Sequence, residues 1–255
     1  MKRREFPILE FDASRRAVIE PSEQIRPSDV PEHCVPCFFG DLIDSLAAAG
    51  TAREAACMKS EMGRHPIYVV EVGGRDVAVF QPGICAAFAG AMLDEVIAHG
   101  CRKFIACGAA GVLDRRIETG HIIVPVSAVR DEGTSYHYLE PSREVEADAG
   151  AVAAIETVLR RRGRPYTLGK TWTTDAFYRE TPDKVALRRS EGCITVEMEA
   201  AAFFAVARFR GVQFAQILYG GDDVSGQEWD HRRWNKRRTT REDLLWLAAE
   251  ACLEL

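Results

Sequence analysis

The chain has 255 residues, of which 47% are hydrophobic and 28% are charged, and its formal net charge is −5. This composition predicts a soluble globular protein with a sizeable core, and the net negative charge argues against nucleic acid or membrane surfaces as partners. No apolar run reaches the roughly 18 residues of a transmembrane helix. The basic N-terminus also lacks the apolar stretch of a signal peptide, so we expect a cytoplasmic protein.

Segments typical of strands and of helices alternate along the chain, with no internal repeat. Apolar runs and alternating patterns predict strands at 16–20, 67–72, 76–80, 103–108, 121–130, 166–174, 193–197 and 212–221. Helical periodicity, glycine stops and a Thr-Pro start predict helices at 41–50, 86–100, 151–163, 181–192, 198–211 and 240–254. This alternation predicts one α/β domain over residues 1–255, with helices on both faces of the sheet and ligands at the carboxyl ends of the strands.

Eight cysteines are scattered through apolar segments, as expected of buried thiols in a reducing compartment. Cys34 and Cys37, within the sequence HCVPC, have the spacing of a zinc knuckle or of a redox pair. No second Cys-x-x-Cys or His-x-x-x-His follows that would complete four zinc ligands. We therefore favour structural thiols and expect no metal site, with a zinc or redox module as the alternative.

Two glycine turns follow predicted strands, at Gly83 and at Gly108. Their backbone N–H groups can approach an anion or a ribose closely, although a glycine in such a place is also typical of a simple tight turn. The spacing from Gly108 to Gly111 does not make a G-x-G-x-x-G motif, and no helical pattern follows. A dinucleotide-binding site is therefore not indicated.

Aromatic and acidic side chains follow two later strands. Phe177 and Tyr178 come after the strand at 166–174, where they can stack on a flat base or belong to the core. Asp222 and Asp223 are adjacent, so their side chains should diverge. We expect one to face a pocket while the other meets water or caps the backbone, and a plain Asx turn is the alternative.

Glu197 and Glu199 flank Met198 where an apolar strand turns into an apolar helix. Burying a carboxylate is costly unless it is compensated, and one of the two acids can cap the helix N-terminus. Because residues two apart on a strand share a face, we expect both carboxylates to face one pocket. There a carboxylate can bind the vicinal hydroxyls of a sugar, and the methionine offers an apolar surface for the ring.

Together these loops resemble the nucleoside phosphorylase family, which contains uridine phosphorylase, the hexameric purine nucleoside phosphorylases and the methylthioadenosine/S-adenosylhomocysteine nucleosidases. The resemblance covers about residues 66–254, and its most specific motif is VEMEAAA at 196–202. Other matching segments are GI at 83–84, GAAG at 108–111, VRDEGTSYH at 129–137 and TTDAFY at 173–178. The family implies a central mixed β-sheet flanked by helices, and assembly as a homodimer or homohexamer.

The resemblance also implies roles for individual residues. The ribose-binding acid of the family falls on Glu199, with Met198 and Glu197 beside it, and the aromatic residue that packs on the base falls on Phe177. Counting from Glu199 without gaps places the aspartate of the purine-acting members on Asp222, which would protonate or hydrogen-bond the leaving purine at N7. Asp223 takes this role if the register shifts by one.

The implied reaction is cleavage of the N-glycosidic bond of a purine-type nucleoside by phosphorolysis, giving base and pentose 1-phosphate as in purine salvage. Inorganic phosphate is the co-substrate, and no cofactor is implied. The residue types suit this chemistry, because the base leaves with negative charge and the sugar develops positive charge. An acid on the base side helps the leaving group, and a carboxylate stabilises the sugar.

The sequence departs from the family at the phosphate site. The family's G-D-P-x-R loop after the first strand corresponds here to IEPSEQIR at 19–26, which lacks glycine, and Ala106 and Ala109 replace the usual arginine and Thr or Ser. A phosphate dianion needs donors and cationic neighbours. Candidate replacements are Gly83, Gly108, Arg26, Arg64, Arg130 and His137, with Arg232 or Arg233 as further possibilities.

These departures leave two alternatives open. Nucleosidases of the family use water and lack the phosphate arginines, and Glu20 or Glu23 could then be the base. A non-catalytic nucleoside-binding protein would bind its ligand without turnover. The segment 226–238 holds Trp229, Trp234 and a basic cluster, and it is interpreted as an interface, a lid or a solvated loop.

Overall fold

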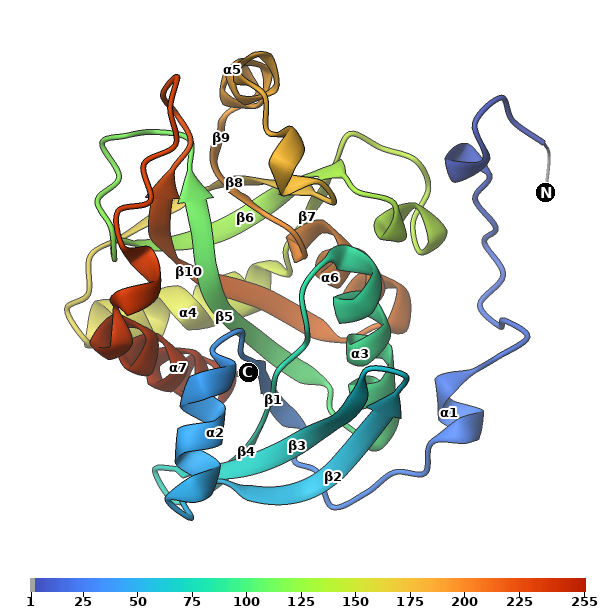
Figure 1. Ribbon diagram of the computed structural model, residues 1–255. Coiled ribbons are helices and arrows are strands. Elements are labelled where there is room, and N and C mark those ends of the chain that lie inside the picture. The colour runs from blue at the N-terminus through green and yellow to red at the C-terminus, as the bar shows by residue number, and fades with distance from the viewer. Residues whose placement is uncertain (1–2) are drawn as a thin grey trace.

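The computed structural model describes residues 3–255 as a mixed α/β fold (Figure 1). Within these residues the strands are β1 His33–Pro36, β2 Arg53–Ser60, β3 Gly63–Val72, β4 Arg75–Phe80, β5 Lys103–Val112, β6 Ile122–Asp131, β7 Glu144–Glu146, β8 Tyr166–Thr174, β9 Cys193–Glu197 and β10 Gln213–Asp223. The α-helices are α1 Pro21–Gln24, α2 Gly40–Ala48, α3 Ala86–His99, α4 Ala149–Arg161, α5 Pro182–Ser190, α6 Ala200–Arg210 and α7 Arg238–Cys252. Short 3-10 helices are η1 Pro7–Leu9, η2 Thr134–His137, η3 Phe177–Arg179 and η4 Trp234–Lys236.

All described strands join one sheet, in the order β10-β6-β8-β9-β5-β1-β4-β3-β2, and β7 pairs with β6. Strand β10 also pairs with β5, so that β5, β10, β6, β8 and β9 close into a ring of paired strands. Strands β1, β4, β3 and β2 extend from β5 as an open arm. Parallel pairs such as β6–β8 and antiparallel pairs such as β3–β4 occur together, which confirms the mixed sheet that the family resemblance implies.

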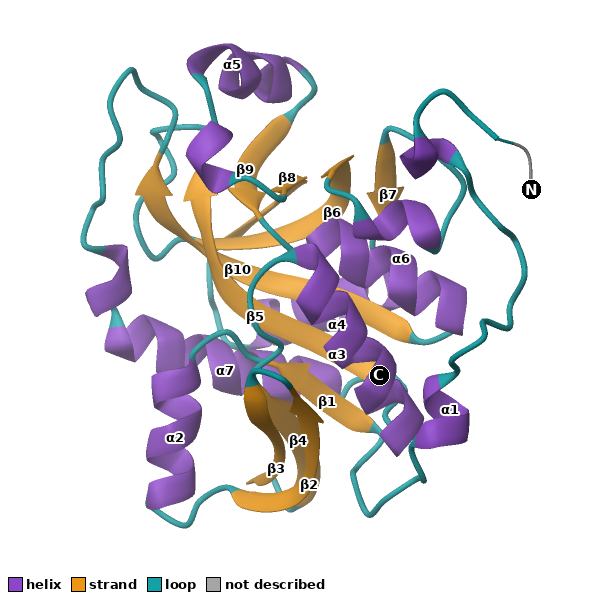
Figure 2. Cartoon of the chain, turned by 45° about the vertical axis from the view of Figure 1, so that its right-hand side comes forward, coloured by secondary structure: helices purple, strands orange, loops and turns teal. Residues whose placement is uncertain are grey.

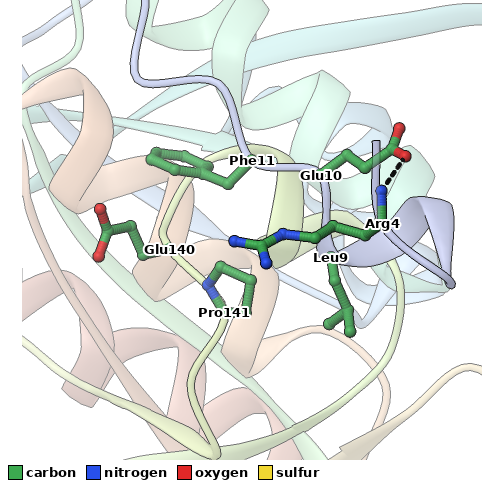
Figure 3. Close-up of a pocket in the computed structure, with 6 residues that line it drawn as sticks. All are labelled: Arg4, Leu9, Glu10, Phe11, Glu140 and Pro141. Atoms are coloured by element: carbon green, nitrogen blue, oxygen red, sulfur yellow. Dashed lines mark hydrogen bonds between the residues drawn. The ribbon is translucent and has the colours of Figure 1, made fainter. Parts of the chain in front are cut away.

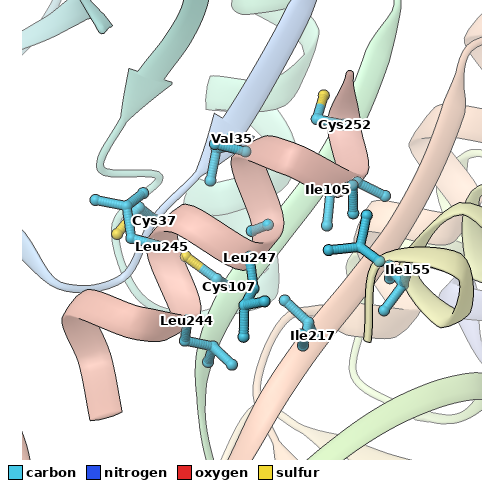
Figure 4. Packing of buried hydrophobic residues seen from close by; sticks show 14 of the residues in the cluster. Val35, Cys37, Ile105, Cys107, Ile155, Ile217, Leu244, Leu245, Leu247 and Cys252 are labelled. Atoms are coloured by element: carbon cyan, nitrogen blue, oxygen red, sulfur yellow. The ribbon is translucent and has the colours of Figure 1, made fainter. Parts of the chain in front are cut away.

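Helices cover both faces of the sheet, as predicted. Along β5, Ile105 and Cys107 point to the side of α2, α4 and α7, while Phe104 and Ala106 point to the side of α3 and α6. This alternation is the two-residue period of a strand, and near-continuous apolar runs arise where both faces are buried. Figure 4 shows the first of these clusters, in which leucines of α7 lie against isoleucines of the sheet and of α4.

Local signals in the sequence account for most of the helix ends. The side chain of Asp148 accepts the Ala151 N–H at the start of α4, and Thr181 accepts the Lys184 N–H at the start of α5, where Pro182 is the first helical residue. At the end of α6, Gly211 adopts the left-handed conformation, with φ of 73°. Such caps satisfy backbone groups that the helix itself leaves free.

The strand predicted at 16–20 does not form, and this prediction was wrong. The segment lies outside the sheet, where the Ala17 N–H binds the side chain of Glu20 and α1 follows directly. The first strand is instead β1, which lies between β4 and β5 and is buried on both faces. Strands β2 and β7 were not predicted, because most of their side chains are exposed or half-buried and their sequences carry no apolar run.

The motif HCVPC is therefore a central strand and its end. Cys34 and Cys37 are both fully buried, but they lie in the clusters on opposite faces of the sheet. Two thiols placed in this way cannot bind one metal ion together, which supports the structural interpretation. Within residues 3–255, no group of three His, Cys, Asp or Glu side chains is arranged to hold a metal ion.

The N-terminal segment, residues 3–28, runs along the outside of α6 and α3 before it reaches β1 (Figure 2). Arg210 of α6 binds Glu20 of this segment at 3.1 Å and Asp94 of α3 at 2.7 Å. Arg15 donates to the carbonyl of Phe209. A cavity of about 550 Å³ lies between this segment and the residues that follow η2, as Figure 3 shows.

The helices among residues 3–255 are too short or too polar to cross a membrane.

Candidate active site

A cavity of about 560 Å³ lies where the last residues of β5, β9 and β10 come together. The loop after β8 and the segment after β10 complete its wall. It is lined by Ala109, Ala110, Gly111, Phe177, Tyr178, Glu180, Val196, Glu197, Met198, Asp222, Val224, Trp229 and Trp234. This is the region in which the sequence predicted a ligand, and we call it the strand-end cavity.

Glu197 ends β9 and fixes the start of α6. Its Oε1 accepts the hydroxyl of Thr173 at 2.6 Å. Its Oε2 accepts the backbone N–H groups of Glu199 and Ala200 at 2.7 and 2.6 Å. Glu197 is therefore the acid that caps the helix, and it also lines the strand-end cavity.

Glu199 lies past the strand, at the N-cap position of α6. Its Oε1 accepts the backbone N–H of Cys85 at 2.7 Å, in the loop that leads into α3. It is buried and does not line the strand-end cavity, whereas Met198 does. The expectation that Glu197 and Glu199 share one face was wrong, because the chain has already turned into the helix at residue 199.

Burial makes both acids of the motif costly to ionise. Burial raises the pKa of Glu197 to about 7, although the Thr173 hydroxyl and two backbone N–H groups oppose this shift. Burial and the charge of Glu197 raise the pKa of Glu199 to about 8. Because the groups that bind the Glu197 carboxyl are all donors, Glu197 suits the charged form, and the pair as a whole retains a proton near neutral pH.

We expect this pair to make the folded protein less stable as pH rises. In the folded state both pKa values exceed the ordinary 4.5, so the stabilising proton is fully present below about pH 4.5 and is lost as pH rises through 7 and 8. The midpoint of thermal unfolding should fall over this interval, by roughly 4–8 °C if about 2 kcal/mol is lost. In Glu199→Gln the fall should be smaller, and an unfolding midpoint that rises from pH 5 to pH 8 would contradict the expectation.

Aromatic side chains also line the strand-end cavity. Phe177 and Tyr178 come from η3, with ring centroids 4.0 Å apart, and Trp229 and Trp234 come from the segment after β10. Phe177 is half exposed rather than part of the core. Flat faces of this kind can stack on a nucleobase.

The two adjacent aspartates diverge, as predicted. Asp222 lines the strand-end cavity, and its Oδ2 accepts the indole N–H of Trp229 at 2.6 Å. Asp223 is buried, pairs with Arg232 at 2.6 Å and accepts the backbone N–H of Ser225 at 2.8 Å. Asp223 therefore holds the backbone, and only Asp222 is available to a ligand in this cavity.

The basic residues considered for phosphate are engaged elsewhere or point away from the strand-end cavity. Arg130 donates to Ser135, Ser142 and the carbonyl of Glu140, and it holds the loop after η2. None of the other candidates lines the strand-end cavity. Arg64 and Arg232 form ion pairs with Glu54 and Asp223. The side chains of Arg26, Arg233 and His137 are exposed to solvent.

The first strand and its loop also lack the expected phosphate donors. The loop after β1 reads Cys37-Phe38-Phe39, so the stretch 19–26 does not follow the first strand, and the placement of Arg26 after it was wrong. Phe38 lies against Gly108: a Cβ built on this glycine would meet the Phe38 ring at 2.9 Å. Gly108 therefore serves close packing and presents no open anion-binding turn to that side.

Neither Glu20 nor Glu23 reaches the strand-end cavity. Glu20 binds Ala17 and Arg210, and Glu23 pairs with Arg16. Glu20, together with His137, lines a separate cavity of about 750 Å³ under the N-terminal segment. The prediction that one of these glutamates is the base of a hydrolase is not supported by their position.

Position 83 requires glycine for two reasons, namely its positive φ and the close approach of the Phe88 ring. Its φ is +78°, and a Cβ there would lie 2.2 Å from the ring of Phe88. We expect Gly83→Ala to lower the free energy of unfolding by about 2–4 kcal/mol, the sum of backbone strain and overpacking. Gly74→Ala is the matched control, because Gly74 has φ of +79° with nothing within 4 Å. Equal losses in denaturant unfolding of the two variants would contradict the contribution of Phe88.

Glu180 is a residue of the site that the sequence did not predict. It follows η3, lines the strand-end cavity and has a pKa raised to about 7 by burial and by the charge of Asp222. Nothing in the sequence around Glu180 distinguishes it from glutamates that lie on the protein surface. Its importance arises only because the loop after β8 brings it next to the end of β10.

Comparison with known proteins places this chain and its fold in one family. The sequence profile of the phosphorylase superfamily matches residues 34–253. Guanosine phosphorylase of Halorubrum lacusprofundi is 28% identical over 156 residues, which are 61% of this chain and 65% of that protein. Uridine phosphorylase of Thermococcus kodakarensis is 28% identical over 207 residues, covering 71% of this chain and 74% of that protein.

Solved structures agree with the fold. Uridine phosphorylase from Vibrio fischeri superposes with a TM-score of 0.72 at 24% identity, covering 89% of this chain and 91% of that chain. The match to the guanosine phosphorylase spans just under two thirds of that relative's length. The family profile, by contrast, covers most of this chain, from β1 to α7. The chain therefore belongs to the phosphorylase superfamily, the group of nucleoside phosphorylases that its Glu197-Met198-Glu199 motif resembles.

Proposed function

We propose that the protein cleaves the N-glycosidic bond of a purine-type nucleoside in the strand-end cavity. The observation that carries the proposal is that residues far apart in the sequence meet in one cavity. Phe177, Met198 and Asp222 come from three different elements, and all line it. The aromatic rings in the lining suit a flat base, while Glu197 and Met198 suit a pentose.

The arrangement fits the charge that develops during cleavage. The acidic groups on the base side, Asp222 and Glu180, can hydrogen-bond or protonate the leaving base. On the sugar side, Glu199 lies next to Met198 and is held by the N–H of Cys85. Glu199 is not part of the lining of the strand-end cavity, so the pentose has to extend past Met198 to reach it. A carboxylate fixed there binds the sugar hydroxyls and stabilises a cationic sugar. An aspartate on the base side is also what favours a purine over a pyrimidine in the family resemblance.

The cavity favours water over phosphate as the acceptor. Of the described residues that line it, none is Arg, Lys or His, and Glu180, Glu197 and Asp222 are acidic. A phosphate dianion in such surroundings would meet negative charge without a cationic partner. Phe38 packs against Gly108, one of the turns considered for phosphate. We therefore propose a hydrolytic nucleosidase reaction that gives free base and pentose.

Phosphorolysis is the second candidate, and the names of the relatives favour it. The relatives aligned with this chain include a guanosine phosphorylase and a uridine phosphorylase, and a phosphorylase uses phosphate as the acceptor. Under this candidate, phosphate would be the co-substrate and the product would be pentose 1-phosphate. A second subunit could supply the cationic groups, since family resemblance implies a homodimer or homohexamer. Nucleoside metabolism in the cytoplasm, as in purine salvage, belongs to the same proposal.

One assay separates these candidates. The purified protein is incubated with inosine, adenosine, guanosine, uridine and methylthioadenosine, with and without phosphate, and the products are resolved by chromatography. Free ribose at equal rates in both conditions supports the hydrolase, whereas base release only with phosphate supports the phosphorylase. Glu199→Gln, purified in parallel, controls for contaminating enzymes. Tight binding of a nucleoside without release of its base would instead indicate a binding protein and overturn the proposal.

A further inference from the structure

Glu180 and Asp222 both line the strand-end cavity, but their carboxyl groups have different hydrogen-bond partners. Asp222 is held, because its Oδ2 accepts the Trp229 indole N–H at 2.6 Å. Within residues 3–255, no hydrogen bond involves the carboxyl group of Glu180, whose backbone N–H is fixed to the carbonyl of Phe177. The unpaired carboxyl of the two is therefore that of Glu180.

The surroundings of Glu180 favour its neutral form. Burial and the negative charge of Asp222 raise its pKa to about 7, so a substantial fraction keeps its proton at neutral pH. The other titratable groups that line the cavity are Glu197 from β9 and Tyr178 from η3, and neither brings positive charge. Because an indole N–H can only donate a hydrogen bond, Asp222 must be the acceptor in its bond with Trp229. The surroundings of Glu180 therefore favour a protonated carboxyl group, whereas those of Asp222 favour a carboxylate that accepts a hydrogen bond.

We propose that Glu180 is the proton donor to the leaving base, and that Asp222, held by Trp229, is its charged partner rather than the acid itself. This inference rests on the proposed nucleoside cleavage and names a catalytic group for it that the family resemblance does not assign. Asp222 keeps a role in binding the base edge.

The proton and electron balance of the step is complete. As the bond between C1′ and the base nitrogen breaks, its electron pair passes to the base, and the Glu180 proton moves to a ring nitrogen of the base. Glu180 is left as a carboxylate. The oxygen of water bonds to C1′ and releases a proton to solvent, from which Glu180 is protonated again. Nucleoside and water give base and pentose, with no oxidant, reductant or cofactor.

The test compares two leaving groups in the full-length protein. Glu180→Gln is measured on the purine nucleoside that the wild type cleaves fastest and on 4-nitrophenyl β-D-riboside, whose phenolate leaves without protonation. We expect kcat on the nucleoside to fall about 100-fold, in the range of general acid catalysis, and kcat on the nitrophenyl riboside to change less than about threefold. Glu228→Gln is the matched control, because Glu228 is exposed on the segment after β10.

The pH profile provides a second readout. Wild-type kcat on the nucleoside should fall as pH rises through about 7, where Glu180 loses its proton, and this limb should be absent in Glu180→Gln. Equal losses on both substrates would indicate a structural role and overturn the inference, as would an unchanged kcat on the nucleoside. If the wild type cleaves the nitrophenyl riboside but no nucleoside, the proposed function fails together with the inference. Cleavage of nucleosides that does not need Glu180 overturns the inference alone.

Discussion

Replacing Glu199 with glutamine is expected to lower kcat/KM for nucleoside cleavage by about 100- to 1,000-fold, which is the effect of losing one preorganised electrostatic group at a reacting centre. The carboxyl of Glu199 is buried at the start of α6 and fixed by the Cys85 N–H, beside the Met198 that lines the cavity. Glutamine keeps the acceptor for Cys85 and the size of the side chain. Glutamine cannot ionise, whereas the Glu199 carboxyl can give up its proton as positive charge develops on the sugar, even though burial raises its pKa to about 8 in the free protein.

Deoxynucleosides make this prediction specific to the sugar. Removing the sugar hydroxyl that Glu199 binds should slow the wild type strongly but slow Glu199→Gln little, because the interaction is already lost. The rates for 2′-deoxy and 3′-deoxy substrates identify which hydroxyl is bound. If the variant discriminates against both deoxy substrates as strongly as the wild type does, Glu199 does not bind the sugar hydroxyls.

Replacing Glu197 with alanine is expected to lower the free energy of unfolding by about 3–5 kcal/mol. The Glu197 carboxylate accepts the Thr173 hydroxyl and the N–H groups of Glu199 and Ala200 within a buried region. Alanine leaves these donors without a partner, and each buried unsatisfied group costs about 1–3 kcal/mol. Denaturant unfolding followed by circular dichroism measures the loss.

A less disruptive variant separates hydrogen bonding from side-chain volume at this position. Glu197→Gln keeps one acceptor oxygen and nearly the same volume, so we expect it to lose less stability than alanine. Thr173→Val removes the donor closest to Glu197 Oε1 and should cost about 1–2 kcal/mol by itself. A loss below about 1 kcal/mol in Glu197→Ala would mean that water or a shifted backbone replaces the carboxylate.

Much of the fold could be predicted from the sequence, because most of its elements are determined locally. The strands at 166–174 and 193–197 have the predicted limits. Apolar residues there are bounded by glycine, proline or a capping residue, and these signals act within a few residues. The prediction failed at 16–20, where a strand-like pattern has no neighbouring strand to pair with. It missed β2, whose pairing with β3 does not depend on an apolar run.

The sequence by itself determined the family, the Glu197-Met198-Glu199 motif and the position of Asp222 at the end of an apolar strand. Only the tertiary structure decided which acid of the motif caps α6, which of Asp222 and Asp223 lines the cavity, and that Glu180 joins them. It also showed that Arg130 and Arg232 are bound to other groups. The physical reason is that side-chain direction, burial and charge partners at chain turns are set by segments remote in sequence, which no local pattern records.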